Sequence, residues 1–83
     1  MYRLVTYPDA AEQVGALPDA ALSAYADILG VVKLVPENGR LYNEAVPDGL
    51  REWVFGPHGE GTVTYLILEH QREVHIVLVQ WIG

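Results

Sequence analysis

The apolar residues of this chain follow two periods, and these periods divide it into strands and helices. Tyr2–Tyr7 ("YRLVTY") is aromatic and β-branched and stops at Pro8, which predicts a first strand. Apolar residues then recur at steps of three and four over Pro8–Leu17, and again between Pro18 and Pro36, which predicts two amphipathic helices. Only "LP" separates the two helical patterns, so we expect them to form an antiparallel hairpin.

The second half of the chain is typical of a loop followed by three strands. Val35–Gly49 holds two prolines, two glycines and two asparagines, which predicts a loop that is either a simple crossover or functional. Segments with strand character follow at Leu50–Phe55, Thr62–Glu69 and Glu73–Ile82. We therefore expect one α+β domain over residues 1–83: an N-terminal strand, a helical hairpin and a three-stranded antiparallel meander, forming one sheet packed on the helices.

Pairing Glu69 with Val74 across the last turn assigns each side chain of the final hairpin to a face, because side chains alternate along a strand. The first face is apolar except for Gln80 and is assigned to the core: Val63, Tyr65, Ile67, Val74, Ile76, Leu78, Gln80 and Ile82. The second face is mixed: Thr62, Thr64, Leu66, Leu68, His75, Val77, Val79 and Trp81. Monomers rarely leave such a patch bare, so we expect a binding surface there, unless Val35–Gly49 folds over it. Its candidate partner-binding residues are Leu66, Leu68, Val77, Val79 and Trp81.

The charge balance bears on the kind of partner. The 83 residues contain five Lys and Arg against eleven Asp and Glu, a formal net charge of −6. Surfaces that bind nucleic acid cluster their basic residues to displace counterions from phosphates, and here the basic residues are scattered along the sequence. No cysteine is present and no histidine spacing matches a metal site, so we expect no disulfide, metal or cofactor. No apolar run is long enough for a membrane helix, and the expected location is the cytoplasm.

Three residues are candidates for acid–base or phosphate chemistry. Arg51 could clamp a phosphate or could simply pair with its neighbour Glu52. Glu52 could act as a general base or lie solvated on its strand. His75 belongs to the mixed face, where it could transfer a proton near neutral pH or be held by a structural hydrogen bond. Trp81 could stack on a base, anchor a partner or complete the core.

The order of the elements resembles the RelE/ParE superfamily, the toxins of bacterial type II toxin–antitoxin systems. The resemblance spans nearly the whole chain and rests on "YRLVTYPDAAEQVGALP", on "DGLREWVFGP" entering the sheet and on "GTVTYLILEHQREVHIVLV" as the paired closing strands. It implies that the helices cover one sheet face and that the other face is a concave site. It also implies a cognate antitoxin as partner. The implied target is messenger RNA cut on the ribosome, as for RelE-like members, or DNA gyrase, as for ParE-like members.

One position departs from the pattern of that superfamily. RNA-cleaving members usually carry an arginine where the third strand begins, and this chain has Thr62 there. Because Arg and Lys do most of the work of stabilising a pentacovalent phosphate, the basic site is depleted. Two functions compete. The chain is either a ribosome-dependent endoribonuclease with Arg51, Glu52 and His75 as catalytic residues, or a protein-binding or homodimeric module without nuclease chemistry. A gyrase inhibitor similar to the ParE-like members is a further alternative.

Overall fold

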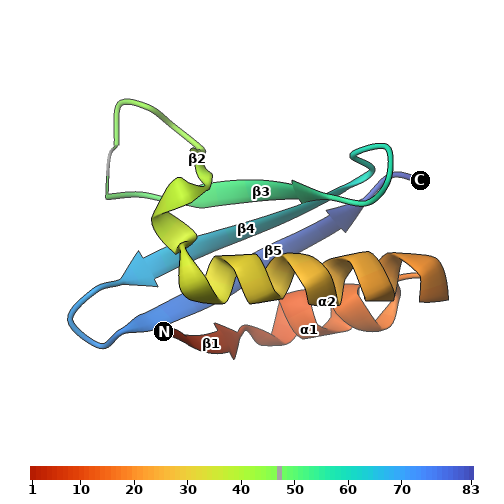
Figure 1. Cartoon of the computed structure of the whole chain (residues 1–83), viewed down its shortest axis with the longest axis horizontal. Helices are drawn as coiled ribbons and strands as arrows, with labels where there is room; N and C mark the ends of the chain where they lie inside the picture. The colour runs from red at the N-terminus through yellow and green to blue at the C-terminus, as the bar shows by residue number, and fades with distance from the viewer. Residues whose placement is uncertain (47) are drawn as a thin grey trace.

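The protein has an α+β fold in which two helices cover one face of a five-stranded sheet (Figure 1). The computed structural model describes residues 1–46 and 48–83. The helices are α1 (Pro8–Gly15) and α2 (Asp19–Leu34), followed by a short 3-10 turn, η1 (Pro36–Asn38). The strands are β1 (Arg3–Thr6), β2 (Arg40–Leu41), β3 (Arg51–Phe55), β4 (Gly61–Leu68) and β5 (Glu73–Trp81). No helix among the described residues is both long and apolar enough to cross a membrane.

The strands are arranged in the order β1-β5-β4-β3-β2. β3, β4 and β5 are antiparallel neighbours, as the predicted meander requires, whereas β1 returns beside β5 in the parallel direction. β2 pairs with the start of β3 and forms the opposite edge of the sheet. The predicted strands and helices are therefore present, and the meander is the centre of a wider sheet whose two outer strands come from the first half of the chain.

Each helix begins at a proline and turns its small or apolar residues toward the sheet. Pro8 occupies the first turn of α1 and Pro18 precedes α2, positions where a missing N–H costs no helical hydrogen bond. Ala10 of α1 and Ala21 of α2 have no exposed surface, which lets both helices approach the strands closely. They cover a single core of twelve buried apolar residues: Tyr2, Ala10, Leu17, Ala21, Tyr25, Val32, Phe55, Val63, Tyr65, Val74, Ile76 and Val79.

The hairpin of β4 and β5 contains a β-bulge that exchanges the faces of the last residues. Leu68 pairs with Glu73, so the predicted pairing of Glu69 with Val74 is wrong. Further along, Tyr65 pairs with Ile76 but Thr64 pairs with Leu78, so β5 has one residue more than β4 at this point. Because side chains alternate along a strand, the extra residue reverses the inward and outward positions that follow it.

Because of the bulge, the predicted faces of the last four hydrophobic positions are wrong. Val79, expected on the open side, is 3 % exposed and belongs to the core. Trp81 also turns inward, and its ring stacks on Phe55 with 5.9 Å between the ring centroids. Leu78, expected in the core, pairs with Thr64 on the opposite face, and Ile82 is 86 % exposed. The predicted inward positions that precede the bulge in sequence all pack in or against the core. They are Val63, Tyr65, Ile67, Val74 and Ile76.

Within the predicted loop Val35–Gly49, the described residues 35–46, 48 and 49 lie at the sheet edge and on the helix side of the sheet. The hydroxyl of buried Tyr65 donates a 2.6 Å hydrogen bond to the carbonyl of Pro36 and fixes the start of the loop. Gly39 passes so close that a Cβ there would lie 2.0 Å from the Tyr65 hydroxyl oxygen. The chain then forms β2, which extends the sheet. The described part of the loop therefore does not cover the face opposite the helices.

Candidate functional site

The face of the sheet opposite the helices, here called the open face, is the candidate functional site. Residues that pair across neighbouring strands share a face of the sheet. The residues of the open face can therefore be read from two sets of pairs: His75 pairs with Val5 and Leu66, and Thr64 pairs with Glu52 and Leu78. The described side chains on it are those of Arg3, Val5, Arg40, Glu52, Val54, Thr62, Thr64, Leu66, Leu68, Glu73, His75, Leu78 and Gln80, with Val77 at the bulge.

The centre of the open face is apolar and half-buried. Leu66, Leu68, Val77 and Leu78 all have intermediate exposure, and none of them belongs to the core under the helices. Thr64 lies among them, and its hydroxyl oxygen is shielded from solvent without a hydrogen-bond partner in the described part of the chain. These side chains form a continuous apolar strip along β4 and β5.

A hydrogen-bonded chain of four polar side chains borders the strip on the β1 side. The Tyr7 hydroxyl lies 2.9 Å from Nδ1 of His75, whose Nε2 lies 2.9 Å from Oε1 of Glu73, and Glu73 forms an ion pair with Arg3. The hydrogen bond from Arg3, followed by that from His75, lowers the pKa of the Glu73 carboxyl. The carboxylate is therefore an acceptor, so Nε2 of a neutral His75 carries the proton and donates it. Nδ1 is then an acceptor, and the Tyr7 hydroxyl donates to it.

On the other side of the strip, Arg40 of β2 forms an ion pair with Glu52 of β3. The hydrogen bond and the charge of Glu52 raise the pKa of Arg40 and so favour its charged guanidinium. Arg3 and Arg40 are the two arginines on this side of the described chain, and each is bound to a carboxylate. The open face therefore offers an apolar centre between two neutralised polar margins.

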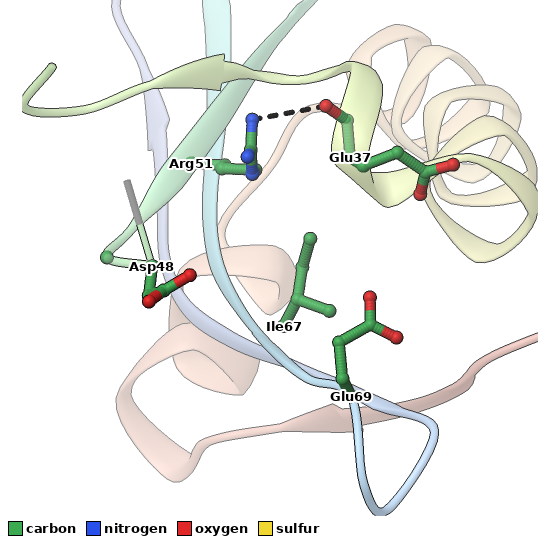
Figure 2. Close-up of a pocket in the computed structure, with 6 residues that line it drawn as sticks. Glu37, Asp48, Arg51, Ile67 and Glu69 are labelled. Carbon is green, nitrogen blue, oxygen red and sulfur yellow. Dashed lines mark hydrogen bonds between the residues drawn. The ribbon is translucent and has the colours of Figure 1, made fainter. Parts of the chain in front are cut away.

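Arg51 points to the other side of the sheet, because it pairs with Tyr65 of the core. Its guanidinium donates to the carbonyl oxygens of Glu37, at 3.1 Å, and Gly39, at 2.9 Å, and so holds the η1 turn in place. It also lines a pocket of about 120 Å³ with the carboxylates of Glu37, Asp48 and Glu69 around it (Figure 2). These contacts give Arg51 a structural role on the helix side.

The three candidate catalytic residues are therefore not brought together. Glu52 and His75 share the open face but lie on β3 and β5, with β4 between them, whereas Arg51 lies on the opposite face. His75 instead contacts Tyr7 and Glu73, and Glu73 in turn binds Arg3; the sequence did not single out any of these three residues. Only the parallel pairing of β1 with β5, which joins residues about 70 positions apart, places these side chains side by side.

The proposed partner-binding residues divide between the two faces. Leu66, Leu68 and Val77 lie on the open face with intermediate exposure, and they remain candidates for contact with a partner. Val79 and Trp81 turn toward the helices because of the bulge, and Trp81 completes the core, one of the alternatives considered for it.

No protein-family model matches the chain, and no curated protein matches its sequence. Solved structures do match it in three dimensions. The isolated RelE toxin of E. coli superimposes with a TM-score of 0.82 and 16 % identity, over 100 % of this chain and 86 % of that one. The chain has the RelE fold.

Structures of RelE in complexes show the same fold. The intact E. coli RelBE toxin–antitoxin complex gives a TM-score of 0.81 and 18 % identity, over 100 % of this chain and 99 % of the matched one. The archaeal RelE–RelB complex of Pyrococcus horikoshii gives 0.67 and 15 %, over 99 % and 96 %. At these identities the likeness establishes the RelE fold for this chain, and its function must be argued from its own side chains.

Proposed function

We infer that this chain is the toxin-like component of a type II toxin–antitoxin system and that its open face binds a protein, with a cognate antitoxin as the expected partner. One observation supports this most strongly. The centre of the open face is an apolar strip, and each of its two arginines is already bound to a carboxylate. The solved structures that share the fold include two complexes of RelE with RelB, which supports a protein partner.

The charges of the open face argue against binding RNA by the usual phosphate clamp. Arginine stabilises the charge that develops on phosphate when its N–H groups are free to point at it. Here an incoming phosphate would have to displace Glu73 from Arg3 or Glu52 from Arg40, and the released carboxylate would repel it. With a net charge of −6, the long-range field also opposes RNA.

Apolar side chains, by contrast, favour a protein partner. Covering Leu66, Leu68 and Leu78 removes their remaining apolar surface from water, which contributes about 25 cal/mol per Å². This contribution depends little on salt, whereas phosphate contacts weaken steeply as salt rises. A complex formed through the strip should therefore survive high salt.

A second function, ribosome-dependent RNA cleavage, is favoured by the Tyr7–His75–Glu73 chain. A neutral imidazole held by a carboxylate is the arrangement that lets histidine accept a proton and carry the resulting charge. In this function the Tyr7 hydroxyl would take the proton of a 2′-hydroxyl while it passes its own proton to Nδ1 of His75. The 2′-oxygen would form a bond to the adjacent phosphorus, and the bond from phosphorus to the 5′-oxygen would break. The leaving 5′-oxygen would take up a proton from solvent.

Cell-free translation with the purified protein separates the two functions. Message ends are mapped by primer extension, with and without ribosomes engaged. Intact message and undiminished translation at micromolar protein would support a binding function alone. Cuts that appear only on translated message would establish the endonuclease, and His75→Asn should then abolish them.

The protein-binding function is tested with a pair of open-face variants. Leu66→Asp places a charge at the centre of the apolar strip, and Thr62→Asp places the same charge on the same strand outside it. We expect Leu66→Asp to abolish co-purification with the product of the adjoining reading frame in 1 M salt and Thr62→Asp to preserve it. Equal behaviour of the two variants would contradict binding through the strip, and dimerisation of the isolated chain, measured by sedimentation, would assign the strip to a second copy.

A further inference from the structure

The five tyrosines of this chain differ in how far their side chains are exposed. Three of them are buried: Tyr2, Tyr25 and Tyr65 are 7 %, 5 % and 0 % exposed. The other two, Tyr7 and Tyr42, are 39 % and 60 % exposed. These two are therefore the tyrosines that a molecule from solution can reach, and they differ in the partner of the hydroxyl group.

The hydroxyl of Tyr7 is bonded to a base. It lies 2.9 Å from Nδ1 of His75, whose Nε2 lies 2.9 Å from Oε1 of Glu73. The rings of Tyr7 and His75 also meet edge to face, with 5.4 Å between their centroids, which restricts the orientation of both. The hydroxyl of Tyr42, by contrast, makes no hydrogen bond to the described part of the chain.

This order of groups is that of an activated nucleophile. A hydroxyl becomes able to attack when an adjacent base takes its proton, and the base works best when a third group orients it. Glu73 has the orienting position, because it accepts the proton of Nε2 and so leaves Nδ1 of the neutral imidazole as an acceptor. Arg3 in turn holds Glu73 by an ion pair. The Tyr7 oxygen can therefore attack an electrophile that arrives from solvent.

The side chains around the imidazole indicate an uncharged electrophile. His75 pairs with Val5 on one side and with Leu66 on the other, so apolar side chains flank it on the open face. The arginine at this margin, Arg3, is bound to Glu73 and is not free to hold a phosphate. An activated carboxylic ester fits these surroundings, whereas a phosphoryl or nucleotidyl donor does not.

We propose that the Tyr7 hydroxyl is an acyl-acceptor site, a nucleophile that takes the acyl group of an activated ester with His75 as its base. A bond forms between the Tyr7 oxygen and the carbonyl carbon of the donor, and the bond from that carbon to the leaving oxygen breaks. The phenolic proton passes to Nδ1 of His75 and then to the leaving oxygen. The product is an O-acyl tyrosine. This reaction goes beyond the functions proposed above, and it depends neither on RNA cleavage nor on what binds the apolar strip.

p-Nitrophenyl acetate tests the proposal as the acyl donor, with Tyr42 as a control in the same molecule. The protein is treated at pH 7, quenched in acid at intervals and digested, and the acetyl group on each tyrosine is quantified by mass spectrometry. We expect Tyr7 to be acetylated at least about tenfold faster than the more exposed Tyr42, because a base is bonded to the Tyr7 hydroxyl. Tyr25 and Tyr65 should stay unmodified as long as the protein is folded.

Two substitutions separate activation by a base from simple accessibility. His75→Asn removes the base and should bring the rate at Tyr7 to within about twofold of the rate at Tyr42. Glu73→Gln keeps the size of the orienting side chain without its charge and should lower the rate at Tyr7 by about threefold or more. In both variants an unchanged rate at Tyr42 shows that the fold is intact. A rate at Tyr7 no higher than that at Tyr42 in the parent protein, or a rate at Tyr7 that both substitutions leave unchanged, would overturn the proposal.

Discussion

The two faces of the sheet are built from alternate residues of the same strands, yet only one is sealed. On the helix side, Val63, Tyr65, Val74 and Ile76 have no exposed surface. On the open side, Leu66 and Leu68 of the same hairpin keep an intermediate exposure with no helix above them. The strands thus supply apolar side chains to both faces of the sheet, but the two helices cover only one of these faces. Folding therefore buries the apolar side chains of the first face and leaves those of the second face partly exposed.

Truncating one residue on each face gives the largest expected contrast. Ile76→Ala creates a cavity in the sealed core and should lower the free energy of unfolding by about 2–5 kcal/mol. Leu66→Ala removes a half-exposed side chain and should cost about 1 kcal/mol or less. Urea unfolding followed by tryptophan fluorescence measures both, and equal losses would show that the open face is buried in solution.

The contact between Gly39 and Tyr65 should give the next largest effect. Gly39→Ala forces a Cβ against the Tyr65 hydroxyl, which is itself bonded to Pro36, and should cost about 1–3 kcal/mol. Gly30→Ala is the matched control, because nothing lies within 4 Å of a Cβ there and alanine favours the helix by about 0.5–1 kcal/mol. Thermal unfolding of the two variants should therefore shift in opposite directions. A stabilised Gly39→Ala would contradict the close approach.

On the open face, replacing the shielded hydroxyl of Thr64 should stabilise the fold. Its oxygen has no hydrogen-bond partner among the described residues, so Thr64→Val removes an unsatisfied polar group without changing the shape and should gain about 1 kcal/mol. Thr62→Val, on the same face with intermediate exposure, should be close to neutral. A loss of stability in Thr64→Val would mean that the hydroxyl is bonded.

The smallest effect concerns the polar margin of the open face. Arg3 and His75 lower the pKa of Glu73 in the folded chain, so the carboxylate contributes stability above its ordinary pKa, near 4.3, and loses it as the pH falls through the folded value. Glu73→Gln should therefore be less stable than the parent at pH 7 and equal to it at the acid end. Urea midpoints between pH 7 and pH 3 measure this. Glu12→Gln, on the exposed side of α1, should give parallel curves throughout.

Local patterns predicted the elements of the fold, because they depend on residues near in sequence. Both helices and the three central strands follow from apolar spacing and from the prolines that begin or end them. The faces of β4 also follow from alternation. Beyond Ile76 the predicted assignment of side chains to faces is wrong. A bulge depends on how two strands pair, and the alternation of apolar residues in either strand does not indicate it.

The candidate site was less predictable for the same reason. His75 was identified by its chemistry, but its partner Tyr7 follows β1, about 70 residues away in sequence, and only the order of strands in the sheet joins them. Arg51 was assigned to phosphate chemistry by residue type, whereas its pairing with Tyr65 turns it to the helix side. Residue type suggested the chemistry of the site, and the long-range pairing of strands decided which residues meet.

The parallel pairing of β1 with β5 also sets the order in which a newly made chain can complete itself. Residues 3–6 are synthesised well before their partners, residues 73–76, and about 70 residues of chain separate the two segments. Contacts that close such long stretches of chain form slowly, and until then β1 has no strand to join. We therefore expect that the polypeptide acquires its full sheet, and with it the Tyr7–His75 contact, only once residues 73–76 are free to pair with β1.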